Sequence, residues 1–236
     1  MTDLSQHVAL VTGANRGLGR EFARQLRDRG ATVYAAARRP ESVDLDGVRA
    51  LALDITDPAS VAAAAEAAPD VTLVVNNAGV SLGQNLVTGD LGEIRREMDI
   101  MFFGTLDVVR AFAPVLARNG GGAVLNVLSA LSWFSLPGTG SYSAAKAALW
   151  SLTNSVRLEL AGQGTQVTGL HLGAADTDMT ADYDGPKADP ADIVRVALDG
   201  LAAGEIEVVA DEWSATVKAS LAADPAEFYD RLLATA

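Results

Sequence analysis

The stretch Thr12-Gly13-Ala14-Asn15-Arg16-Gly17-Leu18-Gly19 decides how this chain is expected to fold. It follows directly on the apolar, β-rich run His7–Val11 and opens the amphipathic pattern of Gly17–Arg29, which is typical of a helix. Glycine lets the backbone turn tightly and approach a ligand closely. The free N–H groups and positive dipole end of the following helix suit a pyrophosphate. The glycines alone would fit an ordinary turn, but their place between strand and helix predicts a dinucleotide-binding turn.

The rest of the chain continues the alternation of strand and helix. Strands are expected at His7–Val11, Thr32–Ala37, Val48–Leu53, Val71–Val75, Gly122–Val127, Gln166–His171 and Ile206–Val209. Helical patterns lie between them, at Gly17–Arg29, Pro58–Ala68, Glu93–Arg118 and Ser141–Gly162. Continuous apolar strands separated by helices indicate a parallel sheet that is covered on both faces. The predicted fold class is therefore α/β: a single-domain, Rossmann-like, doubly wound parallel sheet of about seven strands, with ligands at the carboxyl ends of the strands.

Domain organisation and composition restrict the class of protein further. No linker divides the chain, so residues 1–236 are expected to form one domain, with a substrate loop at about 176–190 and the last strand and C-terminal helices in 190–236. The net charge of −12 argues against a nucleic-acid binder. The chain has no cysteine and hence no thiolate metal site, and no metal is expected. Met1–Gln6 lacks the features of a signal peptide, and no apolar run approaches the roughly 20 residues that span a bilayer, so we expect a soluble, cytoplasmic protein.

Several motifs, in order along the chain, resemble the short-chain dehydrogenase/reductase family. The glycine turn is similar to the family's T-G-x-x-x-G-x-G turn, and Asn76-Asn77-Ala78-Gly79 to its N-N-A-G motif. Tyr142-Ser143-Ala144-Ala145-Lys146 resembles its Y-x-x-x-K motif, and Ser129 lies thirteen residues earlier, where the family has its catalytic serine. Gly173–Met179 resembles its P-G-x-x-x-T segment. The resemblance covers about residues 7–180 and implies an oxidoreductase that interconverts a carbonyl and an alcohol.

The spacing of Tyr142 and Lys146 suits acid–base chemistry. Four residues apart at the start of a helical pattern, their side chains share a face. A nearby ammonium lowers the pKa of a tyrosine, whose reference value of about 10 is too high for work near neutrality. By the resemblance, Lys146 also binds the nicotinamide ribose and Ser129 hydrogen-bonds the substrate oxygen. Without Ser129 and the glycine turn, a surface helix pair would explain the two residues better.

The end of the second expected strand indicates which nicotinamide cofactor is preferred. Ala35-Ala36-Ala37-Arg38-Arg39 has no acidic residue to bind the ribose 2′-hydroxyl of NAD(H). By the resemblance, Arg38 would meet the 2′-phosphate of NADP(H), with Arg16 as a second contact, since arginine pairs with phosphate in a bidentate way. NADP(H) is therefore expected over NAD(H); the alternative is that Arg38 and Arg39 are simply solvated residues after a strand. The resemblance implies further cofactor contacts by Gly13, Asn15, Gly17, Leu18, Gly19, Asp54, Ile55, Asn77, Ala78, Gly79, Tyr142, Lys146, Gly173, Ala175 and Thr177.

Two positions depart from the family pattern. Met101 stands where the family commonly has an asparagine that holds a water linking the lysine to solvent. Either the proton relay is weakened, because the side-chain amide is missing, or Met101 is an apolar packing residue and the relay runs differently. Leu172 stands where the family often has a proline before Gly173, and only a small change in backbone stiffness is expected there.

The segments around the expected nicotinamide site carry apolar and aromatic residues. Leu131, Trp133, Met179 and Tyr183 are expected to contact the substrate, which would suit a hydrophobic ketone, aldehyde or alcohol, although any of them could be a core residue. His171 is expected to be structural. By the resemblance, Glu93–Arg118 and Ser141–Gly162 match the helices through which the family dimerises, so a homo-oligomer is expected.

Two other functions compete with carbonyl reduction. One is a non-catalytic, NADP-binding redox sensor, which only Met101 favours. The other is a ketoacyl-thioester reductase whose substrate arrives on an acidic carrier protein. Arg95 and Arg96 could form a small basic docking patch for such a carrier, but the overall charge of −12 opposes it.

Overall fold

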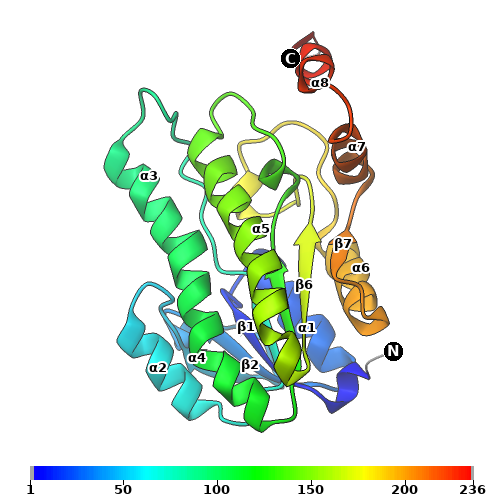
Figure 1. Ribbon diagram of the computed structural model, residues 1–236. Helices are drawn as coiled ribbons and strands as arrows, with labels where there is room; N and C mark the ends of the chain where they lie inside the picture. Colours follow the sequence, from blue (N-terminus) through cyan, green and yellow to red (C-terminus); the bar gives the residue numbers. More distant parts are fainter. Residues whose placement is uncertain (1–2, 235–236) are drawn as a thin grey trace.

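The computed structural model describes residues 3–234 as an α/β fold built on one parallel sheet (Figure 1). The single domain predicted for 1–236 includes residues 1–2 and 235–236, which lie outside the described residues. The sheet has seven strands in the order β3-β2-β1-β4-β5-β6-β7. All of their pairings are parallel, so the predicted fold class is confirmed. The strands are β1 (Val8–Thr12), β2 (Thr32–Ala37), β3 (Arg49–Ala52), β4 (Leu73–Asn76), β5 (Gly122–Val127), β6 (Thr165–His171) and β7 (Glu207–Val209).

The strand order determines where a ligand can bind. The chain runs outward from β1 to β2 and β3, then returns to the other side of β1 as β4. At this reversal the connections that follow β1 and β4 leave in opposite directions and open a crevice at the carboxyl ends of the two strands. The helices are α1 (Gly17–Asp28), α2 (Pro58–Ala67), α3 (Leu91–Met98), α4 (Thr105–Arg118), α5 (Gly140–Leu160), α6 (Pro190–Ala203), α7 (Glu212–Ser220) and α8 (Pro225–Ala234).

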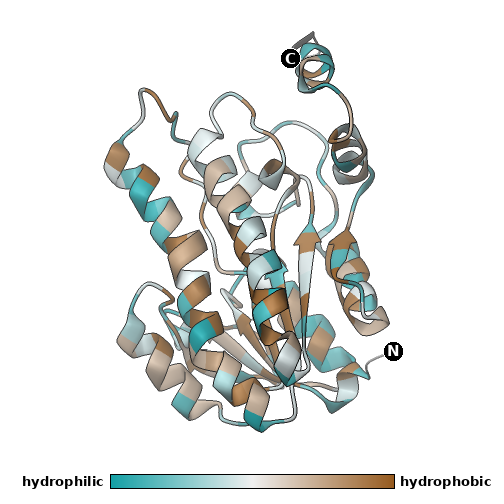
Figure 2. Cartoon of the chain, in the orientation of Figure 1, coloured by the Kyte–Doolittle hydropathy of each residue, from teal (hydrophilic) through white to brown (hydrophobic). Residues whose placement is uncertain are grey.

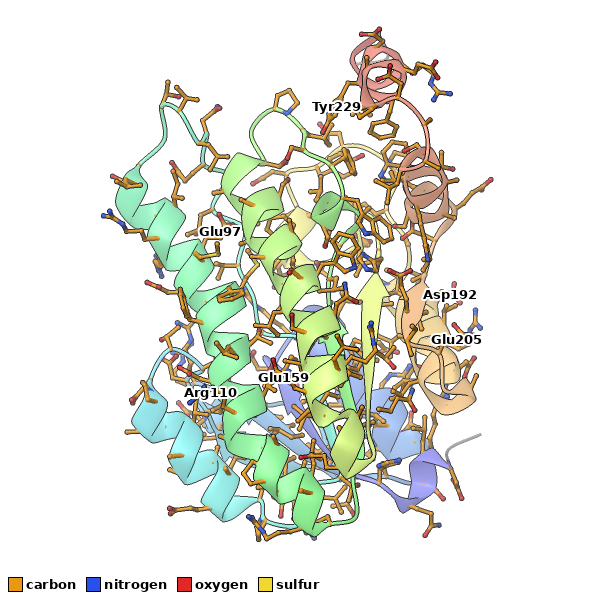
Figure 3. The ribbon with its side chains drawn as sticks, viewed as in Figure 1. Glu97, Arg110, Glu159, Asp192, Glu205 and Tyr229 are labelled. Atoms are coloured by element: carbon orange, nitrogen blue, oxygen red, sulfur yellow. The ribbon has the colours of Figure 1, made fainter. Side chains whose placement is uncertain are left out.

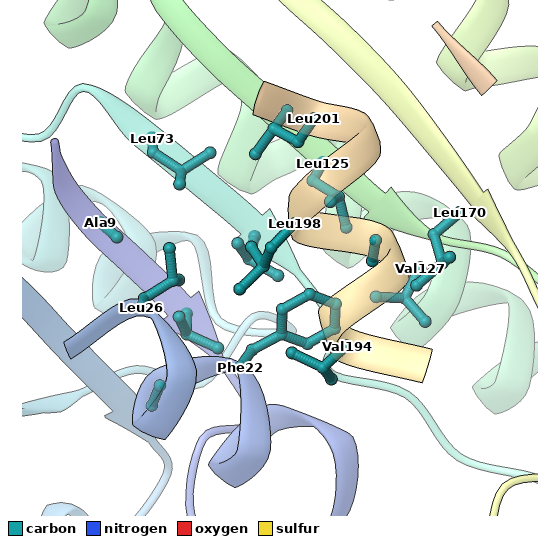
Figure 4. Close-up of a cluster of buried hydrophobic side chains, with 14 of the residues drawn as sticks. Ala9, Phe22, Leu26, Leu73, Leu125, Val127, Leu170, Val194, Leu198 and Leu201 are labelled. Carbon is teal, nitrogen blue, oxygen red and sulfur yellow. The ribbon is translucent and has the colours of Figure 1, made fainter. Parts of the chain in front are cut away.

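One face of the sheet is covered by α1 and α6. Phe22 of α1 and Leu198 of α6 are fully buried in a cluster that includes Leu73 and Leu125 of the central strands (Figure 4). Helices α1 and α6 also contact one another. Burying a phenylalanine or leucine side chain contributes about 1.5–3 kcal/mol, so this cluster anchors α1 and the glycine turn that precedes it.

The other face is covered by α2, α4 and α5. Their apolar side chains meet Leu10, Val74 and Val124 of the sheet in a second buried cluster. In Figure 2 the covering helices carry both hydrophobic and hydrophilic residues, as expected for helices with one face toward a core and one toward solvent. Because both faces are covered, the central strands are apolar on both sides, which accounts for their continuous apolar sequence.

The single helix predicted at Glu93–Arg118 is interrupted in the structure. Between α3 and α4 lies a π-helix, Asp99–Gly104, so the helical stretch begins at Leu91 and runs to Arg118 with a wider turn in its middle. Hydrophobic periodicity gives no signal for such a short insertion, which is why the sequence did not predict it. π-Helical turns occur frequently at functional sites, and this one contains Met101.

The same stretch, Leu91–Arg118, is long and apolar enough to cross a membrane by length and composition alone. Charged residues such as Asp107 and Arg110 interrupt the stretch, so it contains no continuous apolar run of that length. In the structure it contacts α2, α5 and the sheet, and 44% of its most apolar window is buried. The stretch therefore packs against the rest of the fold along part of its surface.

The C-terminal helices α7 and α8 extend beyond the sheet above the carboxyl ends of its strands (Figure 1). They pack through Val217 and Phe228 against the segment after β5, where Phe134 meets the Phe228 ring edge to face at 5.5 Å between centroids. The backbone N–H of Ser135 donates to the hydroxyl of Tyr229 at 3.1 Å (Figure 3). The end of the chain therefore covers the segment that follows Ser129.

Candidate active site

The glycine turn between β1 and α1 has the geometry that close ligand approach requires. Gly13 and Gly17 have φ values of 65° and 51°, in the left-handed region that side chains disfavour. A Cβ on Gly19 would collide with the carbonyl oxygen of Gly13, so α1 can pack on the turn only because residue 19 is glycine. Arg16 precedes α1 in an extended conformation without a side-chain cap, which leaves the first N–H groups of the helix facing the cleft.

The loop after β4 is hydrogen-bonded to this turn. The hydroxyl of Thr12 accepts the backbone N–H groups of Asn77 and Ala78, both at 3.0 Å. The amide of Asn77 donates to the carbonyl of Thr12 at 2.9 Å. These bonds hold the turn and the loop together across the reversal of the sheet. The N-N-A-G motif thus forms part of the floor of the crevice.

A cleft of about 730 Å³ runs along the carboxyl ends of the strands. Among the residues predicted to contact a cofactor, all but Gly19 line this cleft; Gly19 lies buried beneath the turn. The predicted residues that line it are Gly13, Asn15, Arg16, Gly17, Leu18, Arg38, Asp54, Ile55, Asn77, Ala78, Gly79, Tyr142, Lys146, Gly173, Ala175 and Thr177. Residues that are far apart in the sequence therefore meet along one continuous surface.

One end of the cleft is exposed and charged. Arg38 follows β2, is exposed, and lies close enough to Asp54 to lower the pKa of that carboxyl, together with stronger hydrogen bonds from Thr56. Arg16 forms an ion pair with Asp178 at 3.5 Å across the mouth of the cleft, and both side chains are more than 70% exposed. Cationic side chains at this end suit an anionic group.

The other end of the cleft contains Ser129 and Lys146, which are buried, and Tyr142, which is partly buried. Ser129 follows β5 and caps a short 3-10 helix, Ala130–Ser132, with its hydroxyl accepting the N–H of Leu131 at 3.1 Å. Tyr142 and Lys146 lie on consecutive turns of α5 with the Lys146 Nζ 5.6 Å from the centroid of the tyrosine ring. The three residues predicted to carry the chemistry are therefore brought together.

Burial, and not the lysine charge, dominates the pKa of Tyr142. Burial raises this pKa to about 12, while a hydrogen bond from the Ser129 side chain pulls it in the opposite direction. The Nζ of Lys146 donates to the backbone carbonyl of Val127 at 2.7 Å, and burial lowers the pKa of Lys146 to about 8. The expectation that the pKa of Tyr142 would be lowered is not met in this structure, because desolvation of the phenolate is larger than any stabilisation by a nearby ammonium.

The four residues predicted to contact substrate lie in different surroundings. Met179 lines the cleft and is 52% exposed. Tyr183 is exposed on the loop of residues 176–190 and does not line the cleft. Leu131 and Trp133 pack beneath the C-terminal helices, where the Trp133 ring stacks on His171 with 3.8 Å between centroids. Their packing role accounts for the position of these two residues.

Met101 is almost completely buried in the π-helix and lines the cleft. Its thioether lies 3.8 Å from the position that a Cβ on Gly79 would occupy. The residue therefore fills space beside the N-N-A-G loop, as expected of an apolar packing residue.

Two residues near the site were not predicted to act in it. Glu97 on α3 is fully buried and accepts hydrogen bonds from both sides. Glu97 lies four residues before Met101 and therefore on the same face of the helix. A carboxylate among apolar residues on that face is the sequence feature that could have indicated a buried acid. His171 was predicted to be structural; its Nδ1 lies 3.0 Å from the carbonyl oxygen of Ser129, and burial lowers its pKa to about 4.

The residues of the cleft fit a nicotinamide dinucleotide. The glycine turn lets the backbone approach a pyrophosphate at the start of α1. Exposed arginines lie at one end, and a buried ammonium, a phenol and a hydroxyl lie at the other. Among the described residues no group of His, Asp or Glu is arranged to hold a metal ion.

Comparisons with known proteins agree with this arrangement. The family model for short chain dehydrogenases matches residues 7–187. A short chain dehydrogenase from Burkholderia cenocepacia, solved in complex with NADP, is 39% identical and has a TM-score of 0.93, with 99% of each chain covered. An uncharacterized oxidoreductase of Staphylococcus aureus is 31% identical over 85% of this chain and 93% of its own. A 3-ketoacyl-(acyl-carrier-protein) reductase from Brucella melitensis, solved with NADH, is 27% identical with a TM-score of 0.80, covering 88% and 98% of the two chains.

The chain therefore belongs to the short-chain dehydrogenase/reductase family of oxidoreductases. The resemblance stated from the four sequence motifs is confirmed. The matched range, residues 7–187, begins before the glycine turn and ends within the predicted substrate loop.

Proposed function

We propose that this protein is an NADP(H)-dependent oxidoreductase that interconverts a ketone or aldehyde and the corresponding alcohol. The observation that carries the proposal is the meeting of Ser129, Tyr142 and Lys146 at the buried end of a cleft whose other end begins at the glycine turn. A hydroxyl, a phenol and an ammonium can bind a carbonyl oxygen, protonate it and compensate the resulting charge.

The role of each residue follows from its surroundings. The bound nicotinamide supplies a hydride to the carbonyl carbon. Tyr142, whose raised pKa of about 12 keeps it protonated at neutral pH, donates its phenolic proton to the carbonyl oxygen. The Ser129 hydroxyl hydrogen-bonds and orients that oxygen. Lys146, held by the Val127 carbonyl, stabilises the phenolate after the proton has left.

Preference for NADP(H) rests on the charges at the exposed end of the cleft. Arg38 and Arg16 both line it, and Arg38 follows β2, where an acidic residue would repel a 2′-phosphate. Guanidinium groups bind phosphate through two parallel hydrogen bonds. The similarity to a dehydrogenase solved with NADP supports the same preference.

The substrate is proposed to be a small carbonyl or alcohol with an apolar body. Met179 borders the cleft beside Thr180, and Val80 lines it on the side of the loop after β4. Besides Lys146, the cationic residues that line the cleft are Arg16, Arg38, Arg39 and Arg96, so the proposal for an apolar substrate rests on Met179 and Val80.

A substrate panel tests the proposal against its two competitors. The purified protein is mixed with NADPH and a set of ketones, aldehydes and one ketoacyl thioester, and loss of absorbance at the reduced nicotinamide band is followed. Oxidation with free ketones or aldehydes supports the proposal. Turnover restricted to the thioester would favour a ketoacyl reductase, and binding of NADPH without turnover on any compound would favour a redox sensor.

A further inference from the structure

A buried carboxylate lies beside the proposed catalytic pair. Glu97, on the last turn of α3, has no exposed surface, and Figure 3 shows it on the flank of α3 next to α5. Helices α3 and α5 contact one another at this level. Among the residues whose burial is described, Glu97 is the only buried acid and Lys146 the only buried lysine or arginine. An isolated charge in such surroundings is costly, so a buried charge of each sign suggests mutual compensation.

Glu97 joins two segments that shape the site. Its Oε1 accepts the backbone N–H of Leu82 at 2.9 Å, in the loop that follows the N-N-A-G motif. Its Oε2 accepts the hydroxyl of Ser141, the residue before Tyr142. Ser141 in turn accepts the N–H of Gln84 at 3.3 Å. Both carboxylate oxygens of Glu97 are therefore engaged in hydrogen bonds, one to each segment.

We propose that Glu97 is a positioning residue for Tyr142 and Lys146. Its carboxylate holds the first turn of α5 against the loop of Leu82 and places a fixed negative charge beside the buried pair. This inference rests on the proposed function for its meaning, but its central test does not require activity.

The negative charge of Glu97 changes the pKa of Tyr142 and the pKa of Lys146 in the same direction. A neighbouring carboxylate disfavours the phenolate and favours the ammonium, so it raises the pKa of Tyr142 and the pKa of Lys146. Burial remains the larger effect on each. The other ionisable group that interacts with Lys146 is His171 on β6. The remaining charged residues of α3, Glu93, Arg95 and Arg96, are not buried and are screened by water. Removing the Glu97 charge must therefore lower both pKa values.

Glu97→Gln separates charge from shape. The glutamine amide keeps an oxygen to accept the N–H of Leu82 and an NH₂ group that can donate to the Ser141 hydroxyl. The variant can therefore keep both contacts, with donor and acceptor exchanged in the contact to Ser141, and it loses the negative charge. The matched control is Glu93→Gln, which removes a carboxylate one turn earlier on the same helix, where it is partly exposed and paired with Arg96.

Lysine NMR measures the effect directly. The chain has only three lysines, Lys146, Lys187 and Lys218, so protein labelled with ¹³C at lysine Cε gives three signals, which Lys146→Arg assigns. In Glu97→Gln we expect the pKa of Lys146 to fall by about half a pH unit or more, as loss of a nearby charge requires. The signals of Lys187 and Lys218 should titrate as in the wild type, and Glu93→Gln should leave Lys146 unchanged.

Ser141→Ala provides the complementary variant. It removes the hydroxyl contact and keeps the charge, so Lys146 should titrate at or above its wild-type pKa. A fall as large as that in Glu97→Gln would show that packing, and not charge, controls Lys146, and would overturn the electrostatic part of the proposal. Far-UV circular dichroism establishes that each variant is folded before titration.

The pH dependence of kcat/KM should change in the same direction as the pKa of Lys146. The alkaline limb of kcat/KM for carbonyl reduction should move to lower pH in Glu97→Gln by the amount that Lys146 moves. Unchanged titration of Lys146 in a folded Glu97→Gln overturns the proposal for Glu97 and leaves the proposed function intact. The pKa of Lys146 could also fall in Glu97→Gln while the wild-type protein reduces none of the ketones and aldehydes with NADPH. That result would support the role of Glu97 and count against the proposed function.

Discussion

The two ends of the cleft use charge in different ways. At the glycine-turn end, Arg16 and Asp178 are more than 70% exposed and Arg38 is exposed as well. At the other end, Ser129 and Lys146 are each only 6% exposed. Water screens the first set, so an exposed pair contributes about 0–1 kcal/mol and acts mainly through direct contact with a ligand. At this second end, burial raises the pKa of Tyr142 to about 12 and lowers the pKa of Lys146 to about 8.

The comparison teaches that the same residue type carries different information at the two ends. An arginine at the exposed end has nearly the same properties in any protein, so its position in the sequence is enough to suggest its partner. A tyrosine or lysine at the buried end has properties that depend on what packs around it. Substitutions at the exposed end should therefore reduce discrimination between NADPH and NADH. Substitutions at the other end should reduce the rate of carbonyl reduction.

The largest effect is expected for Tyr142→Phe. The substitution removes one hydroxyl and with it the proton donor, so kcat for carbonyl reduction should fall by about 10³-fold, within the range that a general acid contributes. Affinity for NADPH, measured by fluorescence titration, should stay within about twofold of wild type. Turnover within tenfold of wild type would remove Tyr142 from the mechanism.

Arg38→Asp should abolish the preference for NADPH over NADH that we assign to the exposed end of the cleft. Loss of a charge-assisted pair with the 2′-phosphate costs about 1.5–3 kcal/mol, so kcat/KM for NADPH should fall roughly 10- to 100-fold while that for NADH rises. Arg49→Ala is the control, since Arg49 is an exposed arginine of the neighbouring strand that pairs with Asp70 and does not line the cleft. Unaltered preference between the two cofactors would refute the assignment to Arg38.

As the pH rises, the rate of carbonyl reduction should first respond to the deprotonation of Lys146, and only at higher pH to that of Tyr142. The active form has a protonated phenol and an ammonium. The pKa of Tyr142, about 12, keeps the phenol protonated up to that pH, whereas Lys146 loses its charge above a pKa of about 8. We therefore expect kcat/KM to be level below pH 8 and to fall above it, by at most tenfold per pH unit, as measured in a constant-ionic-strength buffer series. A profile that stays level to pH 10 would contradict this assignment.

The smallest effect is expected for Met101→Asn. An asparagine amide offers a hydrogen-bonding group in the cleft that the thioether lacks, so turnover should rise a few-fold if the relay is weakened in the wild type. The buried amide should also lower the free energy of unfolding by about 1–3 kcal/mol. Met101→Leu, which keeps an apolar side chain, should change turnover little; reduced turnover in Met101→Asn would favour a purely packing role.

Much of the fold could be predicted because its signals are local. The bounds of β2 and β5 match the predicted ranges, and the other predicted strands differ by one or two residues at their ends. The turn was predicted because glycine is required where φ is positive, as at Gly13 and Gly17. The π-helix at Asp99–Gly104 was not predicted, since one widened turn barely alters hydrophobic periodicity.

The sequence motifs indicated which residues would meet in the cleft, but they could not indicate what packs around those residues. Ser129, Tyr142 and Lys146 meet as expected, yet the direction of the pKa change in Tyr142 was predicted wrongly, because burial could not be judged from spacing. Trp133 stays a predicted substrate contact, and its stacking on His171 could not be read from the sequence, because the pattern does not show which distant residue packs against an aromatic ring.

The sequence by itself determined the fold class, the position of the glycine turn and the residues proposed to react. Each of these depends on backbone conformation or on residue type, which are properties of short segments. Only the tertiary structure decided that Glu97 lies buried beside α5, that Lys146 binds the carbonyl of Val127, and that the phenol of Tyr142 is desolvated. Solvation and through-space charge depend on which distant segments meet, and that information is absent from any single stretch of the chain.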